Sequence, residues 1–184
     1  MGDFQLDERA QEYARRHGLK FNLKQQLGAG TDGNVWATSR RSAIKVFSRE
    51  RTYLTELGCY RRLASKQIRE IDGLTIPRLL DYADDLWIIE ISLVHPPYLL
   101  DFGKAYIDEP SPYTPEQLAE WRQSWVDFFP GSDLPRVHKV LRLLMALGIE
   151  YVDPKPWNIR FRTEGDRPDD ADVESSEYFS EEDG

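Results

Sequence analysis

Apolar residues recur along the chain with two spacings, and the spacing changes from segment to segment. Leu6, Ala10 and Tyr13 follow one another at three- and four-residue intervals, with Gly18 just after them, so we expect a helix that ends at Gly18. Alternating or continuous apolar runs predict strands. The expected strands are residues 20–27, 34–37, 42–47, 77–82 and 86–93, and a second helix is expected over residues 48–65.

After residue 97 the pattern becomes helical. Thr114 is followed by Pro115 and, three residues after Thr114, by Gln117, which predicts a helix start with a capping box. An apolar stripe follows, and its helical spacing predicts that it faces the core rather than a cofactor. The members of this stripe are Leu118, Trp121, Trp125 and Phe128.

A further helix is expected between Asp133, as its cap, and Gly148, as its end. Its apolar stripe consists of Val137, Val140, Leu141, Leu144 and Leu147. Because Leu143 and Met145 add apolar side chains on its other faces, we expect it to be the buried helix of this half.

Composition and charge narrow the class of protein. The chain has 184 residues, 40% of them hydrophobic and 30% charged, as in ordinary globular proteins. It shows no apolar run of membrane-spanning length and no signal peptide, which predicts a cytoplasmic location and no membrane partner. Cys59 is the only cysteine, so we expect a packing residue and no internal disulfide.

The net charge of -8 is placed unevenly. Residues 163–184 hold ten acidic residues and one basic residue, whereas the rest of the chain is nearly neutral. Such a run predicts a solvated tail. The sequence shows no basic surface with interleaved aromatic residues, so we expect no nucleic-acid partner.

Residues 27–35 carry the pattern G-x-G-x-x-G-x-V, with glycines at Gly28, Gly30 and Gly33 and valine at Val35. Glycine lets the backbone approach phosphate oxygens and present N–H groups to them. A dinucleotide-binding loop has nearly the same pattern but leads into a helix, whereas here another strand follows. A plain glycine-rich turn remains the alternative.

Two later segments extend this pattern. Ala43-Ile44-Lys45 lies on the next expected strand, and Asp153-Pro154-Lys155-Pro156-Trp157-Asn158 follows the last expected helix. Together the three segments resemble the glycine-rich loop, the V-A-I-K strand and the H-R-D-L-K-P-x-N catalytic loop of protein kinases. The resemblance implies an α+β, bilobal protein-kinase-like fold: a small antiparallel-sheet N-lobe (1–93), a truncated, mainly helical C-lobe (94–162) and an acidic tail (163–184).

The resemblance also implies a role for each matching residue. Lys45 would hold the α- and β-phosphates of ATP, paired with Glu56, or with Glu50 as the second choice; either acid could instead be solvated. Ile89 would be the gatekeeper, and the backbone from Glu90 through Ile91 to Ser92 would meet adenine.

In the catalytic loop, Asp153 would accept the proton of the attacking hydroxyl, Lys155 would neutralise the moving phosphoryl group, and Asn158 would ligate Mg²⁺. Val35 and Ala43 would complete the nucleotide site. A Pro-rich turn is the structural alternative for this loop.

The pattern departs from the family in three places. Tyr151-Val152 replaces the His-Arg pair before Asp153. Asp101-Phe102-Gly103 has the sequence of the metal-binding D-F-G motif but precedes the catalytic loop, so its order excludes that role and predicts a turn. Only 26 residues follow Asn158, too few for a full activation segment, and the second metal ligand is therefore expected among Asp169, Asp170 and Asp172.

The sequence thus favours an ATP- and Mg²⁺-dependent phosphotransferase acting on an unknown hydroxyl acceptor. A pseudokinase, which binds nucleotide or a protein partner without catalysis, is the main alternative. An interaction module that binds no nucleotide is the third.

Overall fold

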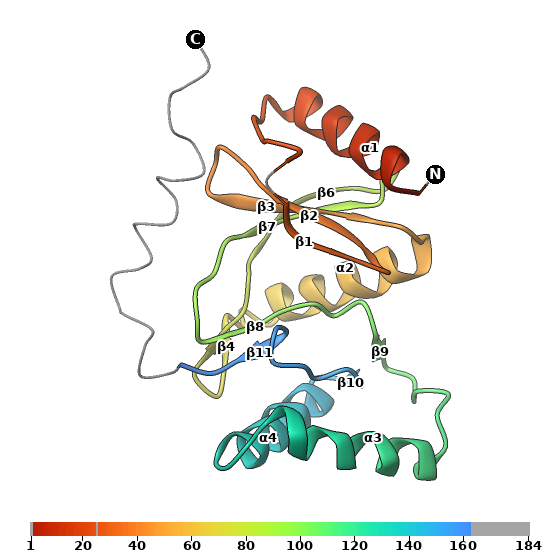
Figure 1. The fold of residues 1–184 in the computed structure, drawn as a ribbon, viewed down its shortest axis with the longest axis vertical. Helices are drawn as coiled ribbons and strands as arrows, with labels where there is room; N and C mark the ends of the chain where they lie inside the picture. The colour runs from red at the N-terminus through yellow and green to blue at the C-terminus, as the bar shows by residue number, and fades with distance from the viewer. Residues whose placement is uncertain (1, 25, 163–184) are drawn as a thin grey trace. The chain divides into compact units, whose positions relative to one another are not determined.

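The computed structural model describes residues 2–24 and 26–162, which form two compact units. Unit 1 comprises residues 2–54 and 77–95, and unit 2 comprises residues 55–76 and 96–162. The mixed α+β class predicted from the sequence is confirmed: an antiparallel sheet lies in the N-terminal part, and four helices occur among the described residues (Figure 1).

Unit 1 is built on a five-stranded antiparallel sheet with the strand order β1-β2-β3-β7-β6. Four of the five strands lie close to their predicted positions. The strands are β1 (Gln26–Gly30), β2 (Gly33–Ala37), β3 (Ser42–Phe47), β6 (Leu79–Ala83) and β7 (Ile88–Ser92).

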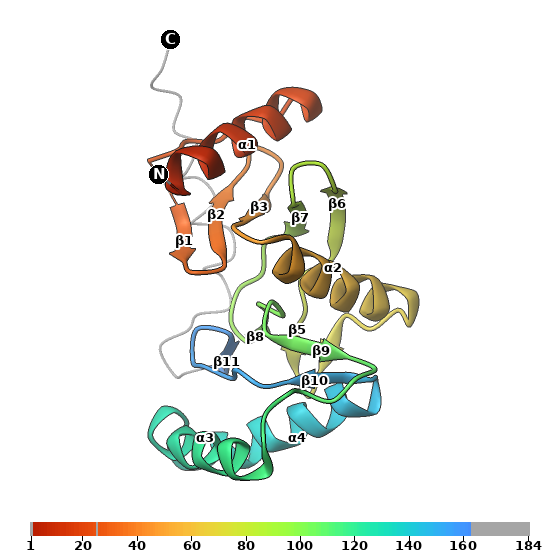
Figure 2. The same cartoon turned by 90° about the vertical axis from the view of Figure 1, so that its right-hand side faces the viewer.

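Helix α1 (Gly2–His17) packs on one face of this sheet (Figure 2). Gly18 ends the helix as predicted: it has a left-handed backbone (φ +62°), and the N–H of Leu19 donates to the carbonyl of Ala14 at 2.8 Å. This is the Schellman arrangement that glycine favours. The buried cluster between helix and sheet consists of Leu6, Ala10, Tyr13, Ala14, Leu19, Trp36, Ile44, Val46, Leu86 and Ile88.

The prediction of a strand from residue 20 was wrong at its start, because β1 begins only at Gln26. Before Gln26, backbone groups form hydrogen bonds with side chains and not with another strand. The N–H of Lys24 donates to Asn22 Oδ1, and Trp36 Nε1 donates to the carbonyl of Leu23. Such local side-chain partners compete with strand pairing. The strand instead continues through the glycines to Gly30.

Helix α2 (Glu50–Ser65) begins in unit 1 and continues in unit 2. Its predicted apolar side, formed by Tyr53, Leu57, Tyr60 and Leu63, is fully buried. The helical spacing therefore identified the inner face of this element correctly.

Unit 2 contains a hairpin that the sequence analysis missed, formed by β4 (Glu70–Ile71) and β5 (Leu74–Thr75). Asp72 and Gly73 connect the two strands with φ values of +52° and +80°. Asp-Gly is a strong hairpin signal because both central residues of a type I′ turn need positive φ.

The remaining strands of unit 2 are short. β5 pairs with β8 (Tyr98–Leu99) in parallel, and β8 pairs with β11 (Ile159–Arg160) in antiparallel orientation. A separate two-stranded sheet joins β9 (Ala105–Ile107) to β10 (Ile149–Tyr151). These pairings place residues 98–107 against the segments on both sides of residues 152–158.

Helices α3 (Pro115–Phe128) and α4 (Asp133–Ala146) complete unit 2. The predicted capping box of α3 is confirmed, since Thr114 accepts from the N–H of Gln117, whose side chain bonds back to Thr114. The predicted cap of α4 was wrong by one position: Ser132 is the N-cap residue, and Asp133 is the first helical residue.

The expectation that α4 is the buried helix of this half was correct for only one of its faces. Val137, Val140 and Leu144 are fully buried, but Leu143 and Met145 are 40% and 53% exposed. Apolar residues on several faces predict burial only where a neighbouring element covers each face.

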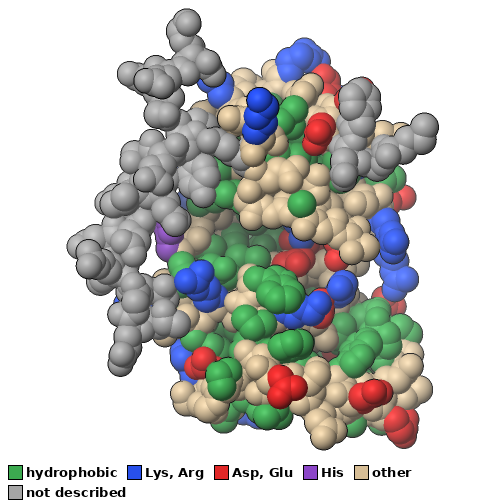
Figure 3. Space-filling view, in the orientation of Figure 1, with side chains coloured by type: hydrophobic (Ala, Val, Ile, Leu, Met, Phe, Trp, Pro, Cys, Tyr) green, Lys and Arg blue, Asp and Glu red, His purple; other side chains and the backbone are tan. Residues whose placement is uncertain are grey.

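On the surface drawn in Figure 3, acidic, basic and apolar side chains of the described residues are interspersed.

Candidate functional site

The glycine-rich loop is the hairpin between β1 and β2, in which Gly28 pairs with Val35 and Gly30 with Gly33. Gly33 has φ +144°, and a Cβ there would lie 2.0 Å from the carbonyl oxygen of Val46, so the fold itself requires glycine. At Gly28 and Gly30 a Cβ would meet no atom within 4 Å. Their backbone therefore borders open space, as a loop that receives a ligand requires.

Strand register places most of the predicted nucleotide residues on one face of the sheet. Lys45 is directly opposite Val35 on β2 and Ile89 on β7, and Ala43 is opposite Ile91. Cross-strand neighbours point to the same face. The intervening residues face α1 instead, so these five side chains lie on the sheet face away from α1.

Lys45 is a buried cation, with 7% of its surface exposed and its Nζ 5.0 Å from the centre of the Phe47 ring. Its predicted partner Glu56 is 1% exposed and lies on α2. Lys45 belongs to unit 1 and Glu56 to unit 2. The ion pair between them stays a prediction, as does the choice between Glu56 and Glu50.

Glu90 differs from the other predicted nucleotide residues because its side chain lies on the α1 face. Its carboxylate accepts a hydrogen bond from the Tyr13 hydroxyl at 3.0 Å and another from the Ser42 hydroxyl, which also contacts Thr38 Oγ1 at 2.6 Å. Any contact of Glu90 with adenine would therefore come from its backbone.

Residues 152–158 form a compact loop between β10 and β11. The backbone N–H groups of Asn158 and Ile159 both donate to the carbonyl of Lys155 at 2.8 Å. Asn158 is buried, and its Nδ2 donates to the carbonyl of Asp153 at 3.4 Å. These bonds hold the residues of the D-x-K-P-x-N pattern in one turn, so Asp153, Lys155 and Asn158 are neighbours.

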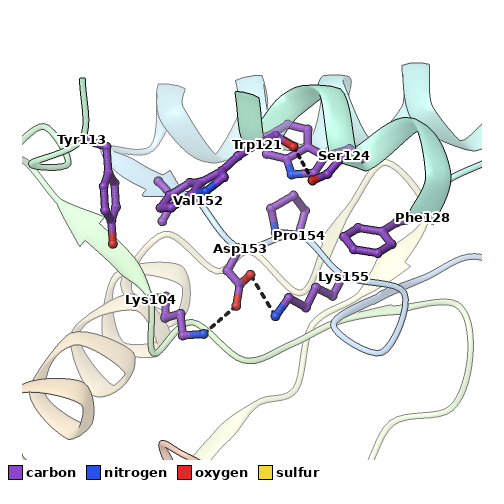
Figure 4. Close-up of a pocket in the computed structure, with 10 residues that line it drawn as sticks. Lys104, Tyr113, Trp121, Ser124, Phe128, Val152, Asp153, Pro154 and Lys155 are labelled. Carbon is purple, nitrogen blue, oxygen red and sulfur yellow. Dashed lines mark hydrogen bonds and ion pairs between the residues drawn. The ribbon is translucent and has the colours of Figure 1, made fainter. Parts of the chain in front are cut away.

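Asp153 lies between two lysines (Figure 4). Lys104 Nζ donates to Asp153 Oδ2 at 3.0 Å, and Lys155 Nζ lies 3.3 Å from Asp153 Oδ1. Lys104 was not among the predicted site residues. It directly follows Asp101-Phe102-Gly103, the segment for which the sequence predicted a turn.

Asp153 borders a cavity of about 390 Å³ within unit 2. Figure 4 shows aromatic side chains from α3 on one side of Asp153, with the two lysines beside it. The residues that line the cavity are Lys104, Tyr113, Trp121, Ser124, Trp125, Phe128, Val152, Asp153, Pro154 and Lys155.

The prediction that the aromatic residues of α3 are core was correct for only one of those that line the cavity. Trp125 is 8% exposed, whereas Trp121 and Phe128 are 38% and 40% exposed. Helical spacing shows which residues share a face but not whether another element covers that face. These side chains form a cavity wall.

Tyr60, Tyr151 and Cys59 are buried titratable residues of unit 2, and burial shifts their pKa values. Burial raises the pKa values of the Tyr60 and Tyr151 hydroxyls well above the usual value, and the carboxylates of Glu56 and Asp101 raise them further. Burial, followed by the charge of Glu56, also raises the pKa of the Cys59 thiol to about 12. Cys59 is therefore an inert packing residue, as predicted.

The predicted tail ligands Asp169, Asp170 and Asp172 lie outside the described residues. Within residues 2–24 and 26–162, no group of three or more His, Cys, Asp or Glu side chains is arranged to hold a metal ion. No helix in that part of the chain combines the length and apolar character needed to cross a membrane.

Comparisons with known proteins give limited similarity. No protein-family model and no curated protein matches the chain. Among solved structures, the ternary complex of streptomycin, ATP and APH(2'')-IIa is 14% identical with a TM-score of 0.35. The ADP-bound aminoglycoside phosphotransferase APH(2'')-Ib is 15% identical with a TM-score of 0.36. Each match covers 66% of this chain, which spans about a third (35%) of either structure.

Proposed function

We propose that this chain is an ATP-dependent phosphotransferase that moves the γ-phosphoryl group of ATP to a hydroxyl acceptor. The observation that carries the proposal is the position of Asp153 at the edge of a cavity of about 390 Å³, in one turn with Lys155 and Asn158. Cavities of this size hold small molecules. A carboxylate beside one can orient a bound hydroxyl group and accept its proton.

The reaction assigns a task to each residue of the turn. The acceptor hydroxyl would give its proton to Asp153 while its oxygen forms a bond to the γ-phosphorus, and the bond from that phosphorus to the β–γ bridging oxygen would break to leave ADP. Lys155 would neutralise the moving phosphoryl group, and Asn158 would hold Mg²⁺. The ion would neutralise charge on the phosphates.

Unit 1 would supply the nucleotide-binding residues. The open space over Gly28 and Gly30 suits phosphate, and Lys45 lies on the same sheet face as Val35, Ala43, Ile89 and Ile91. A buried charge needs a partner of opposite sign. Because Lys45 and Glu56 are both buried, the proposal keeps Glu56 as the group that positions Lys45.

The cavity lining indicates the kind of acceptor. Among the described residues that line the cavity, Asp153 is the only acidic one, and both of its carboxylate oxygens contact a lysine. A polycationic acceptor would have to compete with Lys104 and Lys155 for this one carboxylate. The aromatic wall instead favours a neutral or anionic hydroxyl compound that carries a flat ring.

A pseudokinase remains the second candidate, and one observation favours it. Lys104 and Lys155 together engage both oxygens of Asp153, which would compete with an acceptor hydroxyl. Each carboxylate oxygen has a second lone pair that can accept a hydrogen bond, so this contact permits catalysis but does not require it. The pseudokinase would bind nucleotide or a protein partner without turnover.

Thermal melting with ATP tests nucleotide binding. ATP with Mg²⁺ at about 100 times its dissociation constant should add about 2.7 kcal/mol of stability, which raises the melting temperature by about 5–10 °C for a chain of this size. The absence of a shift at saturating ATP, with and without metal, would rule out both the phosphotransferase and the nucleotide-binding pseudokinase.

The variant Asp153→Asn separates the two candidates. It should keep ATP affinity and lower ATP turnover by a factor of about 10²–10⁴, because orienting the hydroxyl contributes to the reaction step and not to ground-state binding. Asp133→Asn, at the half-buried start of α4, is the control. Turnover equal to that of the wild type would assign Asp153 a structural role, and a wild type that binds ATP without turnover would favour the pseudokinase.

A further inference from the structure

The lining of the cavity beside Asp153 has a positive formal charge. Among the described residues that line it, Lys104 and Lys155 are basic, Asp153 is acidic, and the other seven carry no formal charge. Figure 4 shows the two lysines on opposite sides of Asp153. A concave site in which one sign of charge is in excess attracts ligands of the opposite sign. The cavity therefore favours an anionic ligand over a cationic one.

Lys104 is the lysine of this cavity that the proposed reaction does not use. Lys155 has the task of neutralising the moving phosphoryl group, whereas no step involves Lys104. Its Nζ donates to Asp153 Oδ2 at 3.0 Å, and 51% of its side chain is exposed. Ion pairs with such an exposed partner contribute little to the stability of a fold. Because an ammonium group has three N–H donors, Lys104 can contact a ligand oxygen while it keeps Asp153.

Strand pairing fixes the position of Lys104 in the chain fold. Lys104 directly precedes Ala105, the first residue of β9, and Ala105 is opposite Tyr151, the last residue of β10. The chain continues from Tyr151 into Val152 and Asp153. In an antiparallel pair, the residue before one strand lies beside the residues that follow the other. The backbone therefore holds Lys104 at the start of the loop that contains Asp153.

The same strand connects Lys104 to the aromatic wall of the cavity. Tyr106 lies on β9, and its ring contacts the Tyr113 ring edge-on at 6.2 Å between ring centres. The Tyr113 ring in turn contacts Trp121 of α3 at 4.4 Å. Tyr113 and Trp121 line the cavity together with Lys104. A cation and a flat apolar surface are thus available to one ligand within unit 2.

The distance between Lys104 and Asp153 limits the spacing of the groups on such a ligand. Since hydrogen bonds join two heavy atoms at about 2.7–3.0 Å and Lys104 Nζ lies 3.0 Å from Asp153 Oδ2, a ligand hydroxyl on Asp153 and an anionic oxygen on Lys104 are at most about 10 Å apart. A hydroxyl group and a carboxylate at opposite ends of one benzene ring satisfy this limit.

We propose that Lys104 binds the carboxylate of an aromatic hydroxy acid, the acceptor whose hydroxyl group lies at Asp153. The proposal rests on the proposed function and assigns its acceptor to the anionic class. The reaction keeps its balance: the hydroxyl oxygen of the acid bonds to the γ-phosphorus, its proton passes to Asp153, and ADP leaves. Lys104 forms and breaks no covalent bond. It determines which acceptor binds.

Two probes of nearly equal shape test this role. 4-Hydroxybenzoate carries the carboxylate, and 4-hydroxybenzamide has an uncharged amide in its place. Calorimetric titration of the full chain, without nucleotide, should show about tenfold tighter binding of 4-hydroxybenzoate to the wild type, because its contact with Lys104 is charge-assisted. Lys104→Gln should reduce this ratio to about one, and Lys104→Arg should restore most of it, since arginine keeps the charge.

Lys139→Gln is the matched control. Lys139 is also a lysine of unit 2 that pairs with an aspartate, Asp72, and its side chain is 56% exposed, against 51% for Lys104. It is not among the described residues that line the cavity. The ratio of the two affinities should therefore be the same in Lys139→Gln as in the wild type.

Several results would overturn the inference: an unchanged ratio in Lys104→Gln, equal affinity of the wild type for the two probes, or no binding of 4-hydroxybenzoate. Loss of the ratio in Lys155→Gln but not in Lys104→Gln would assign the carboxylate to Lys155 and overturn it as well.

The absence of nucleotide separates this inference from the proposed function. A ratio that depends on Lys104, in a chain that does not turn over ATP with 4-hydroxybenzoate, would refute the phosphotransferase and keep the carboxylate site. Turnover of ATP by a chain whose ratio is unchanged in Lys104→Gln would refute only the inference.

Discussion

The three glycines of the glycine-rich hairpin between β1 and β2 have different steric surroundings. Gly33 lies against the backbone of β3, where a Cβ would be 2.0 Å from the carbonyl oxygen of Val46. Its φ of +144° would also strain any residue other than glycine. Gly28 and Gly30 have neither constraint. At the scale of single residues, the motif therefore combines one glycine that the fold needs with two whose role depends on a ligand.

We predict opposite effects for substitutions at these positions. Gly33→Ala should lower the free energy of unfolding by about 3 kcal/mol or more, because neither the backbone of β3 nor the φ angle can adjust cheaply. Gly28→Val should change that free energy by less than about 1 kcal/mol, since valine suits a strand, but should weaken ATP binding about tenfold. Urea unfolding and calorimetry measure the two quantities.

The two readouts also show how this prediction could fail. If Gly28→Val binds ATP like the wild type, the hairpin does not contact phosphate and Gly28 is only a turn residue. If Gly33→Ala is as stable as the wild type, the close approach of β2 to β3 at this point is not rigid.

The apolar stripe of helix α3 contains both buried and exposed side chains. Trp121 and Trp125 both line the cavity beside Asp153, but Trp125 is 8% exposed, whereas Trp121 is 38% exposed and contacts the Tyr113 ring edge-on, at 4.4 Å between ring centres. An amphipathic helix can therefore place buried and exposed side chains of one stripe along the same cavity.

We predict that Trp121 binds the acceptor. 2-Naphthol, a flat and uncharged hydroxyl compound, should quench tryptophan fluorescence on binding, and Trp121→Ala should weaken this binding about tenfold because a ring contact contributes about 0.5–1.5 kcal/mol beyond its buried area. Val126→Ala is the control, since Val126 is 56% exposed on the same helix and is not among the cavity-lining residues. Tighter binding of streptomycin than of 2-naphthol would contradict the acceptor class proposed above.

Helix α1 carries a charge cluster with a defined pH dependence. Hydrogen bonds from Arg15 and Arg16 lower the pKa of the Glu12 carboxyl from 4.5 to about 2, and both arginines lie 2.8 Å from Glu12 Oε1. A carboxyl whose pKa is lower in the folded chain stabilises the fold above pH 4.5, and this contribution is lost as the pH falls towards 2.

We therefore predict that the melting temperature falls between pH 4.5 and pH 2, with Glu12 contributing to the slope. In Glu12→Gln the decline over this range should be smaller, because the substituted side chain no longer takes up a proton. Glu8→Gln, another exposed position on α1, controls for the loss of one charge. Because the pair is exposed, high salt should reduce the difference; equal slopes in both variants at low salt would refute the assignment.

In the molecule as a whole, the residues predicted to bind nucleotide or to catalyse the reaction belong to two different units. Unit 1 contains the glycine hairpin and Lys45, and unit 2 contains Glu56, Asp153, Lys155 and Asn158.

We predict that a chain ending at Arg167 loses most of the Mg²⁺-dependent gain in ATP affinity. This truncation removes Asp169, Asp170 and Asp172, among which the second metal ligand is expected, but leaves Asn158 in place. Affinity without metal should stay equal or increase, because the truncation removes eight acidic residues whose negative charge repels the phosphates of ATP. Calorimetry of both chains, with and without Mg²⁺, makes the comparison; an unchanged metal-dependent part after truncation would contradict the prediction.

Local spacing along the sequence was sufficient to predict most elements of this protein. The helix ending at Gly18, the capping box at Thr114 and the strand with Ala43-Ile44-Lys45 are all present. Each depends on neighbours within a few residues: a glycine that can adopt positive φ, side chains that cap N–H groups, and apolar periodicity. The missed hairpin at Asp72-Gly73 also had such a local signal.

Only the tertiary structure decided which distant segments meet and which apolar faces stay uncovered. Strands β8 and β9 pair with the flanks of residues 152–158, which lie more than 40 residues later in the chain, because strand pairing depends on backbone hydrogen bonds and not on chain order. Likewise, Trp121 and Trp125 share one helical stripe, but only Trp125 is buried. The sequence by itself determined the elements and the local motifs, whereas packing determined the neighbours and the exposure of each side chain.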